Sequence, residues 1–554
     1  MKITAAEALI RSLEMEGVEV VFGYPGGAIL PVYDSLFHTK KLKHILTRSE
    51  QAAAHAASGY ARVSGKVGVC MATSGPGATN LVTGIATAYM DSVPVVAITG
   101  QVATSLIGRD VFQEVDITGA TAPFTKHNYL VKRAEDIPRI VKEAFYIAST
   151  GRPGPVLIDL PKDVAETKIE FKYPEQITLR GYKPKIDGHP LQISRAADAI
   201  NKALRPVICA GGGVNSAGAE EELMELAEKA HIPVATTLMG IGAFPGDHPL
   251  SLGMMGMHGT PYANRAVTES DLVIATGARF GDRLTGRVAG FAPRAKIIHI
   301  DIDPAEIGKN VKADIPIVGD VKRVLAEILK EVQPKQPTEW NHRIAELKKK
   351  PFSYSKTNKL CPQEIIEELS RRTAGNAIIT TEVGSHQMWV AQYYKFTKPR
   401  TFISSGGLGT MGYGLPAAIG AKFAKPDQTV INICGDGSFQ MNLAEMATAV
   451  ENGLSLKMIL FNNQGLGLVR QLQEFYCKKR YSQVNFSFVP DFVKLAESYR
   501  IAGMRIGNRD ELPGALDRLI SEKGCFLLEC MVDINENVYP MVLNGSPINE
   551  MIGG

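Results

Sequence analysis

Two short apolar stretches that end in polar residues constrain the fold of this chain more than any other feature. Val430–Ser438 reads Val-Ile-Asn-Ile-Cys-Gly-Asp-Gly-Ser, and Lys457–Asn463 reads Lys-Met-Ile-Leu-Phe-Asn-Asn. Both fit buried parallel strands of about five residues, and the apolar spacing from Ser438 to Asn452 predicts a helix between them. Such a strand-helix-strand unit brings Asp436 and Asn463 to the sheet edge where open α/β sheets bind ligands.

The side chains at this edge suit a metal ion and a phosphate. A carboxylate and an amide oxygen are hard ligands of the kind that Mg²⁺ prefers, and Mg²⁺ often shares them with diphosphate oxygens. Gly435 and Gly437 leave the backbone open to a phosphate. Gly-Asp-Gly followed one helix later by Asn-Asn resembles the diphosphate-binding motif of thiamine diphosphate (ThDP) enzymes. The alternative is a plain strand-helix-strand unit with a polar turn.

The length of the chain predicts several domains. At 554 residues it exceeds what one hydrophobic core usually serves, so we expect about three α/β domains of 150–200 residues. Each is expected to be a doubly wound parallel sheet. A polar stretch with several prolines from Tyr173 to Pro190 and a charged helical stretch from Pro334 to Lys359 read as linkers. The expected domains are residues 1–172, 190–335 and 360–554.

Composition and cysteine usage exclude several classes of protein. A formal net charge of +4, with no run of like charges, gives no support to nucleic-acid or membrane-surface binding. The seven cysteines form no CxxC pair and no zinc-type cluster, so we expect reduced, mostly buried thiols in a cytoplasmic protein. Met1–Ile10 fits a capped amphipathic helix rather than a signal peptide. No apolar run approaches the roughly 20 residues that span a bilayer.

One carboxylate near the N-terminus is a candidate acid. Glu50 lies in the first turn of an Ala-rich helix that begins after the strand His44–Thr47. Its plain interpretation is complementarity to the helix dipole. ThDP chemistry also needs a carboxyl group beside N1′ of the aminopyrimidine, and a carboxylic acid held neutral in an apolar site serves as such a proton donor.

Four further motifs make the resemblance closer. They resemble the pyrimidine domain of acetohydroxyacid synthase, also called acetolactate synthase, and comprise Tyr24–Ala28, Arg48–Gln51, Thr73–Asn80 and Phe112–Glu114. The resemblance to the catalytic large subunit of that enzyme extends over the whole chain. The resemblance implies that Glu50 is the N1′ carboxylate and that the Gly26–Gly27 backbone faces the reacting centre. It also implies that the substrate approach is lined by Phe112, Gln113 and Lys126.

The middle third resembles the FAD-binding central domain of that family. Gly211–Val214 follows a strand but is not a G-x-G-x-x-G fingerprint, so alone it supports a nucleotide site only weakly. Arg283 matches a family arginine near the substrate carboxylate, which suits a bidentate fork, while Gly281 stands where the family usually has an acidic residue. The resemblance assigns to FAD the residues Arg152, Gly211, Gly212, Thr237, Leu238, Met255, His258, Gly277, Arg279, Asp301, Ile302, Asp320 and Val321.

The C-terminal third contains Gly407–Gly412, which does satisfy G-x-G-x-x-G. A dinucleotide site is rejected because the preceding strand is poor and Asp436 is already assigned to metal. In the family this loop passes beneath ThDP, with Met411 propping the cofactor and the carbonyl of Gly465 as a third Mg²⁺ ligand. Ser385 replaces a usual glutamine. The further ThDP contacts that the resemblance implies are Val383, Gly384, His386, Gln387, Gly409, Gly437 and Ser438.

Three positions depart from the family in the expected pocket for the second substrate. Leu472 stands where the family usually has tryptophan, Leu468 where it has methionine, and Ala103 where it often has proline. Loss of the aromatic ring predicts a reduced preference for 2-ketobutyrate over pyruvate and poor sensitivity to sulfonylureas.

The resemblance implies ThDP-, Mg²⁺- and FAD-dependent decarboxylation of pyruvate and carboligation to a second 2-ketoacid, pyruvate or 2-ketobutyrate. This is the first common step of branched-chain amino-acid biosynthesis. Family precedent places each ThDP between two subunits, so a homodimer or homotetramer is expected. The sequence leaves open whether the chain also binds a small regulatory subunit. The alternatives are a flavin-dependent pyruvate oxidase, a catabolic acetolactate synthase without FAD, and a cofactor-binding paralogue without catalysis.

Overall fold

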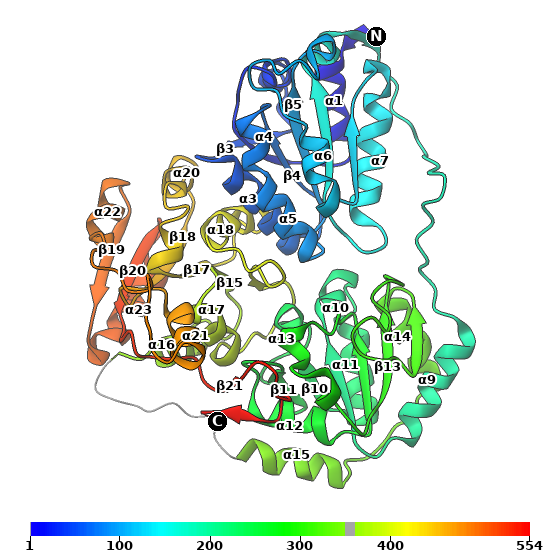
Figure 1. The fold of residues 1–554 in the computed structure, drawn as a ribbon, viewed down its shortest axis with the longest axis vertical. Helices are drawn as coiled ribbons and strands as arrows, with labels where there is room; N and C mark the ends of the chain where they lie inside the picture. Colours follow the sequence, from blue (N-terminus) through cyan, green and yellow to red (C-terminus); the bar gives the residue numbers. More distant parts are fainter. Residues whose placement is uncertain (1, 350–359, 554) are drawn as a thin grey trace.

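Three parallel six-stranded sheets organise the residues that the structure, a computed structural model, describes: 2–349 and 360–553. Helices cover both faces of each sheet (Figure 1). The three doubly wound α/β units predicted from the sequence are therefore confirmed. Two short antiparallel pairs complete the described strands: β1 (Lys2–Thr4) with β8 (Lys168–Glu170), and β21 (Met541–Val542) with β22 (Met551–Ile552).

The N-terminal sheet has the spatial order β3 (Lys43–Leu46), β2 (Val20–Gly23), β4 (Gly68–Ala72), β5 (Val95–Gln101), β7 (Val156–Pro161), β6 (His127–Leu130). Sequence analysis missed β6, because this edge strand is partly polar. The helices of this unit are α1 (Ala5–Met15), α2 (Leu30–Phe37), α3 (Glu50–Ser64), α4 (Pro76–Asn80), α5 (Val82–Met90), α6 (Ile117–Thr121), α7 (Ile137–Ser149) and α8 (Lys162–Glu166).

The middle sheet has the order β11 (Ser251–Met254), β10 (Val234–Thr236), β9 (Pro206–Ala210), β12 (Leu272–Thr276), β13 (Lys296–Asp301), β14 (Ile315–Val318). Two central strands, β9 and β12, lead to opposite halves of the sheet, which is the switch point where such sheets bind ligands. The helices are α9 (Pro190–Lys202), α10 (Gly212–Ala217), α11 (Glu220–Ala230), α12 (Pro261–Glu269), α13 (Asp282–Thr285), α14 (Val321–Glu331) and α15 (Glu339–Lys349).

The C-terminal sheet has the order β16 (Phe402–Ile403), β15 (Ile378–Thr381), β17 (Val430–Gly435), β18 (Leu456–Asn462), β20 (Phe526–Met531), β19 (Ala502–Ile506). When strands are numbered along the chain, this is the same order as in the N-terminal sheet. The helices are α16 (Pro362–Arg372), α17 (Ser385–Tyr393), α18 (Gly414–Ala424), α19 (Asp436–Phe439), α20 (Glu445–Glu451), α21 (Gly467–Tyr476), α22 (Phe492–Ser498) and α23 (Leu512–Ser521).

The single helix predicted over Ser438–Asn452 is wrong, because the structure has two short helices, α19 and α20, with a turn between them. Asn442 lies in that turn, and its Nδ2 donates to the carbonyl of Gly412 at 2.6 Å. Glu445, the first residue of α20, accepts the N–H groups of Arg48 and Ser49 at 2.8 and 3.1 Å. The break between α19 and α20 thus lets the side chains of Asn442 and Glu445 bind distant parts of the chain. Such tertiary contacts cannot be predicted from apolar spacing.

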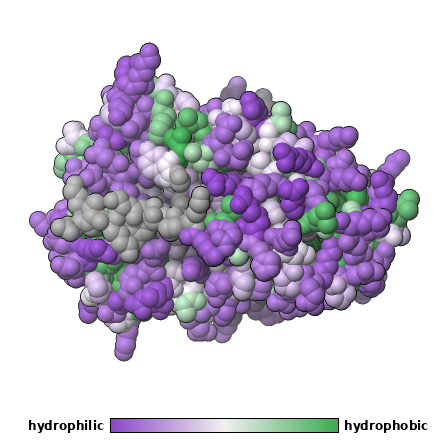
Figure 2. Space-filling view, turned by 90° about the horizontal axis from the view of Figure 1, so that it is seen from below, coloured by the Kyte–Doolittle hydropathy of each residue, from purple (hydrophilic) through white to green (hydrophobic). Residues whose placement is uncertain are grey.

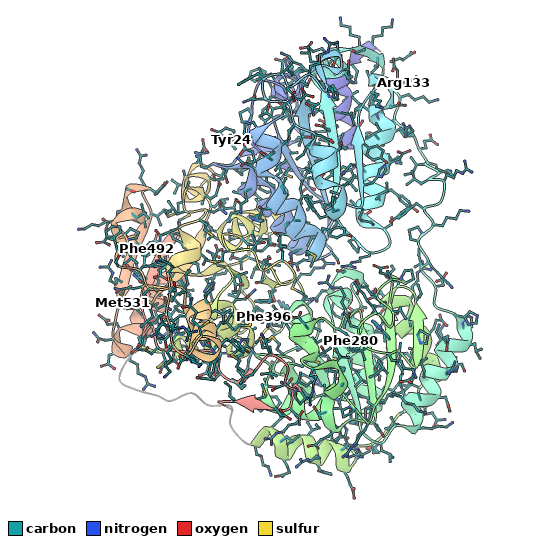
Figure 3. The ribbon with its side chains drawn as sticks, viewed as in Figure 1. Tyr24, Arg133, Phe280, Phe396, Phe492 and Met531 are labelled. Atoms are coloured by element: carbon teal, nitrogen blue, oxygen red, sulfur yellow. The ribbon has the colours of Figure 1, made fainter. Side chains whose placement is uncertain are left out.

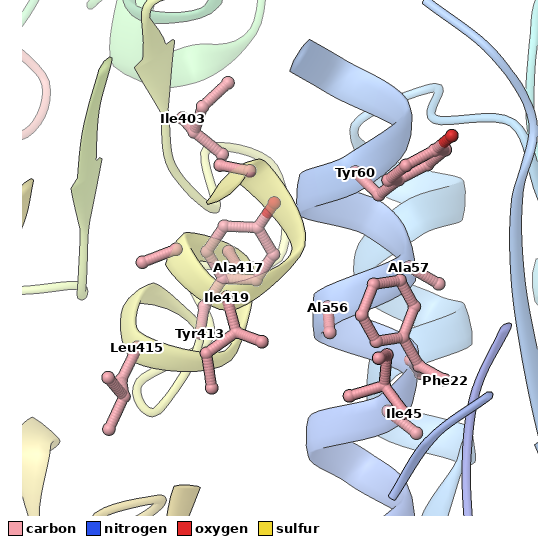
Figure 4. Packing of buried hydrophobic residues seen from close by; sticks show 14 of the residues in the cluster. Phe22, Ile45, Ala56, Ala57, Tyr60, Ile403, Tyr413, Leu415, Ala417 and Ile419 are labelled. Atoms are coloured by element: carbon pink, nitrogen blue, oxygen red, sulfur yellow. The ribbon is translucent and has the colours of Figure 1, made fainter. Parts of the chain in front are cut away.

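Helices α3 and α18 join the N-terminal and C-terminal units through one continuous core (Figure 4). Phe22, Tyr60, Tyr413 and other members of this core are buried and come from both units. A Cβ atom at Gly59 would overlap the backbone of Ala417. The two helices therefore pack backbone to backbone, and the units are fixed to each other rather than loosely tethered.

A histidine at this junction makes stability depend on pH. His55 is fully buried against the Tyr413 ring, with 5.2 Å between centroids, and burial followed by the nearby Arg62 charge lowers its pKa to about 3. Its stabilising contribution is complete above pH ~6.5 and falls as the pH drops from there toward 3, because only the unfolded chain takes up the proton, at about 1.4 kcal/mol per pH unit.

We therefore expect His55→Gln to reduce the loss of thermal stability between about pH 7.5 and pH 5 by roughly 2 kcal/mol. Unfolding temperatures followed by circular dichroism at both pH values measure this. His38→Gln, at an exposed position of the same unit, serves as the control and should retain the wild-type pH dependence. An unchanged pH dependence in His55→Gln would contradict the assignment.

The ends and connections tie the three units together. Residues 171–189 run between the first two units without forming a helix or strand, and of the predicted linker up to Lys359, residues 350–359 lie outside the described part. The C-terminal tail returns to the middle unit, where Val542 N–H donates to Met257 O at 2.8 Å.

Hydrophilic residues predominate on the face of the molecule shown in Figure 2. No described helix has both the length and the apolarity needed to cross a membrane.

Candidate active site

The predicted metal ligands converge at the carboxyl edge of the C-terminal sheet. Strands β17 and β18 are parallel neighbours, so Asp436 and Asn463 leave the sheet side by side. The N–H of Gly465 donates to Asp436 Oδ2 and to Asn463 Oδ1, both at 3.2 Å. Gln464, which lies between Asn463 and Gly465 in the chain, has φ +58°. This left-handed conformation turns the chain back over Asp436. The three residues form one compact oxygen-rich cluster.

The environment of Asp436 fits a cation. Its side chain is buried, and its hydrogen bonds come from backbone N–H groups such as that of Gly437 at 3.1 Å. Burial raises its pKa to about 7, as expected for a carboxylate without a charged partner. The described residues contain no cluster of three or more His, Cys, Asp or Glu side chains suited to a metal. A carboxylate, an amide and a carbonyl therefore favour Mg²⁺ over a softer metal.

A small cavity beside this cluster has unsatisfied polar groups. Ser385 Oγ, His386 Nε2 and Trp389 Nε1 are buried without a hydrogen-bond partner, and burial lowers the pKa of His386 to about 3, so its ring is neutral. Such groups fit a polar ligand that completes their hydrogen bonds. The predicted cofactor and metal residues that line this cavity are Val383, Gly384, His386, Met411, Asp436, Gly437, Ser438, Asn463 and Gly465.

Glu50 belongs to a second cluster, around the turn that follows β4. Ser49 caps α3 by accepting the Ala52 N–H at 3.2 Å, which confirms Glu50 in the first turn. Glu50 is half-buried, and its Oε2 accepts a hydrogen bond from Asn80 Nδ2 at 2.9 Å. A Cβ atom at Gly77 would lie 3.4 Å from Glu50 Oε1. The carboxylate thus faces a glycine backbone that leaves room for a ligand.

Gly26 and Gln113 pack against the same turn. A Cβ atom at Gly26 would overlap the Thr73 side chain, and one at Gly75 would lie 2.8 Å from the carbonyl oxygen of Gln113. Gln113 itself has φ +60°, a conformation that costs a non-glycine residue about 1 kcal/mol or more and often occurs at functional sites. Three of the predicted catalytic residues are therefore brought together.

Lys126 lies elsewhere. Its Nζ donates to the carbonyls of Ile147 and Thr150 at the end of α7, and to Tyr182 OH at 3.0 Å. Burial lowers its pKa to about 8. The small cavity beside Asp436 is not lined by Glu50, Gly26, Gln113 or Lys126, and neither is the large cavity of the middle unit described next. Within one chain the Glu50 cluster and the Asp436 cluster thus do not share a cavity.

A cavity of about 1020 Å³ lies between the middle unit and its neighbours. It opens at the carboxyl ends of β9 and β12, the switch point of the middle sheet. Of the residues predicted for FAD, all but Gly211 line it; Gly211 lies behind, where a Cβ atom would overlap the Gly277 backbone. Phe280, labelled in Figure 3, also contributes to the wall. The size and the glycine-rich wall fit a large dinucleotide.

Charged groups stand along this cavity. Arg152 Nη1 pairs with Glu306 at 2.8 Å and with Asp303 at 3.2 Å. Burial raises the pKa of Asp301 to about 6 and lowers that of His258 to about 4. Arg283 is 63% exposed at the rim, where Nη1 donates to Asn544 Oδ1 at 3.2 Å. Its guanidinium is therefore accessible to a small anionic ligand.

The large cavity reaches the small one. Val383 and Leu468 line both, while Gln387, Gly409 and Leu472 line the large one. Sequence reasoning missed Asn80, the partner of Glu50, although it lies in a motif that carried the resemblance. It also missed Glu382, which is fully buried, accepts the Leu415 N–H at 3.1 Å and has a pKa raised to about 7 by burial.

Comparisons with known proteins agree with this architecture. Residues 3–120 match the N-terminal TPP binding domain of thiamine pyrophosphate enzymes, residues 193–328 their central domain, and residues 382–530 their C-terminal TPP binding domain. The chain is 55% identical to a probable acetolactate synthase large subunit of Methanocaldococcus jannaschii (99% of this chain, 95% of that protein). It is 50% identical to the acetolactate synthase large subunit of Buchnera aphidicola (99% and 98%) and to the acetolactate synthase of Mycobacterium bovis (99% and 91%). The chain therefore belongs to the ThDP-dependent enzymes and, among them, to the acetolactate synthase large-subunit family.

Proposed function

We propose that this chain forms acetolactate from two molecules of pyruvate at a site built by Glu50 and the Asp436 cluster. The observation that carries the proposal is the convergence of Asp436, Asn463 and Gly465 beside a cavity with unsatisfied buried polar groups. This is the first common step of branched-chain amino-acid biosynthesis, with 2-ketobutyrate as the alternative second substrate.

Asp436, Asn463 and the carbonyl of Gly465 would hold Mg²⁺, which neutralises diphosphate charge. Gly437, Ser438 and His386 would bind the diphosphate end of ThDP, assisted by open backbone at the glycines. When bound, ThDP supplies the electron sink that decarboxylation of a 2-ketoacid requires. Glu50 would hold a proton at N1′ of the aminopyrimidine, and Asn80 fixes the orientation of the Glu50 carboxyl group by donating to its Oε2.

Gly26 and Gln113 pack against the same turn as Glu50 and would face the reacting side, while Met411 would position the cofactor from the C-terminal unit. Arg283 orients the carboxylate of the second 2-ketoacid at the cavity rim. Residues such as Arg152, Thr237 and Asp301, which line the large cavity, would hold FAD there. This assignment rests on the cavity's size and on its position at the switch point.

Two copies of the chain complete each site. The proposal is supported by the separation of the Glu50 cluster from both cavities within one chain and by the exposure of apolar residues beside that cluster. Phe112 is 86% exposed and Leu30 is 52% exposed, so a second copy would bury apolar surface there. The relatives are named large subunits, which supports a small partner subunit as well.

The test is an assay with pyruvate as the sole substrate, with purified protein, ThDP, Mg²⁺ and FAD. Acetolactate, measured as acetoin after acid treatment, is the expected product, without oxygen uptake. Oxygen consumption with formation of acetate or acetyl phosphate would replace the proposal by a flavin-dependent oxidase. Full activity without bound flavin would point to the catabolic type.

Leu472 sets the choice of the second substrate. It lies on α21 and lines the large cavity with Leu468, so its side chain decides how much apolar contact the ethyl group of 2-ketobutyrate makes. We expect Leu472→Trp to raise the 2-ketobutyrate-to-pyruvate preference about tenfold and to increase sulfonylurea inhibition. Competition assays with both ketoacids measure the ratio. Leu472→Met keeps the volume without a ring and should change neither; a strong 2-ketobutyrate preference in the wild type would contradict the argument.

A further inference from the structure

The segment 405–413, which carries Met411, is held by side chains from the N-terminal unit of the same chain. Asp91 follows α5 directly, and its Oδ1 accepts the N–H of Gly407 at 2.6 Å. Its Oδ2 accepts the N–H of Gly406 at 3.1 Å and pairs with Arg62 Nη2 at 2.6 Å. One carboxylate thus joins α3, the end of α5 and this segment.

Both charged partners are removed from solvent. The Asp91 side chain has no exposed surface, and that of Arg62 is 10% exposed. A Cβ atom at Gly407 would lie 2.9 Å from Asp91 Oδ1, and one at Gly406 would overlap the Met239 side chain. The two glycines allow the backbone to reach the carboxylate, so the contact depends on residue types at both ends.

Further contacts hold the same segment on either side of Met411. Thr87 Oγ1 and Thr410 Oγ1 lie 2.7 Å apart. Tyr413 OH lies 3.1 Å from Ser58 Oγ, and the Arg62 guanidinium stands over the Tyr413 ring at 5.5 Å. All of these partners come from α3 and α5. The N-terminal unit therefore contacts the segment both before Met411, at Thr410, and after it, at Tyr413.

The segment borders both cavities of the site. Asp91 and Gly406–Gly409 line the large cavity, while Met411 lines the small one. The position of this segment therefore determines where Met411 stands in the lining of the small cavity. Neither Asp91 nor Arg62 lines the small cavity, so the pair acts on that cavity only through the segment 405–413.

We propose that Asp91, paired with Arg62, is a positioning residue: it fixes the segment 405–413, and so Met411, for the binding of ThDP. The inference rests on the proposed role of Met411. It means that the N-terminal unit has two tasks in the assembled enzyme. Its Glu50 cluster serves the cofactor of one site, and its Asp91 shapes the Met411 wall within its own chain.

Asp91→Asn tests the inference, because the amide keeps one acceptor for Gly407 but turns a donor toward Gly406 N–H and Arg62. Hydrogen-deuterium exchange of peptides spanning residues 402–413 should become faster before any cofactor is added. The affinity for ThDP with Mg²⁺, followed by quenching of Trp389 in the small cavity, should weaken about 10- to 100-fold.

The matched control is Asp271→Asn in the middle unit. Asp271 also accepts two consecutive backbone N–H groups, those of Leu204 and Arg205, both at 2.8 Å, but lines neither cavity. It should leave ThDP affinity unchanged. Should Asp91→Asn fold poorly, the double variant Arg62→Met/Asp91→Asn removes the unpaired charge as well, and the same faster exchange and weaker binding are expected.

Wild-type exchange of residues 402–413, a ThDP affinity within about twofold of wild type, or an equal loss in Asp271→Asn would each overturn the inference. Met411→Ala is assayed alongside. If that variant binds ThDP and turns over like the wild type, the proposed role of Met411 fails, whereas the exchange result on Asp91 does not depend on it. The two failures are therefore distinguishable.

Discussion

Glu50→Gln is expected to lower the rate of acetolactate formation by about 10²- to 10⁴-fold, the range for losing a positioned acid-base group. The amide has the shape of the carboxyl group, and its oxygen still accepts the Asn80 hydrogen bond, so α3 and its cap should remain intact. Only the capacity to share a proton with the aminopyrimidine is removed. Steady-state assays with pyruvate at saturating ThDP and Mg²⁺ measure the effect.

Glu7→Gln is the matched control for this substitution. Glu7 also stands in the first turn of a helix of the N-terminal unit, α1, and pairs with Arg11 on the surface. Its replacement should leave the rate within about twofold, since exposed pairs contribute little. A Glu50→Gln enzyme that keeps more than about a tenth of the wild-type rate would contradict the acid-base role.

Asp436→Ala is expected to abolish binding of Mg²⁺ and ThDP together, with activity reduced by about 10³-fold or more. The substitution removes the one carboxylate of the cluster, and the amide of Asn463 and the carbonyl of Gly465 alone supply no negative charge. Titration of ThDP with Mg²⁺, followed by tryptophan fluorescence, measures binding. Removal of Mg²⁺ from the wild-type enzyme by EDTA should reproduce the loss reversibly.

Asp427→Ala is the matched control, because Asp427 is exposed at the opposite end of β17. It should bind ThDP like the wild type. If Asp436→Ala still bound ThDP in a Mg²⁺-dependent manner, the metal would have to lie elsewhere, and the assignment of the cluster would fail.

The parts of this fold that sequence predicted are those with local signals. Asp436 and Asn463 follow runs of buried apolar residues, so their place at a sheet edge follows from strand direction alone. Glu50 follows a serine cap before an alanine-rich helix, which again is a local pattern. Assigning these residues to ThDP chemistry needed the resemblance to a known family, because each also had a purely structural interpretation. For Asp436 and Asn463 this was a polar turn, and for Glu50 it was complementarity to the helix dipole.

The parts that sequence missed depend on contacts between distant segments. The helix predicted over Ser438–Asn452 is broken because Asn442 and Glu445 bind the backbone of Gly412 and Arg48. Likewise, Asp91 and Gly407 are 316 positions apart, and nothing local to either predicts their contact. Lys126 remains a prediction for the substrate approach, although its amino group binds the end of α7 within the chain.

The most direct test of the central claim, that Glu50 of one copy and Asp436 of another serve one cofactor, mixes two inactive variants. Glu50→Gln and Asp436→Ala are purified separately, combined in equal amounts under conditions that exchange subunits, and assayed for acetolactate. Random pairing makes half of the dimers hybrids with one intact site of two, so the mixture should regain about a quarter of the wild-type activity. A mixture that stays at the background of the separate variants, with subunit exchange verified by mass spectrometry, would contradict the account.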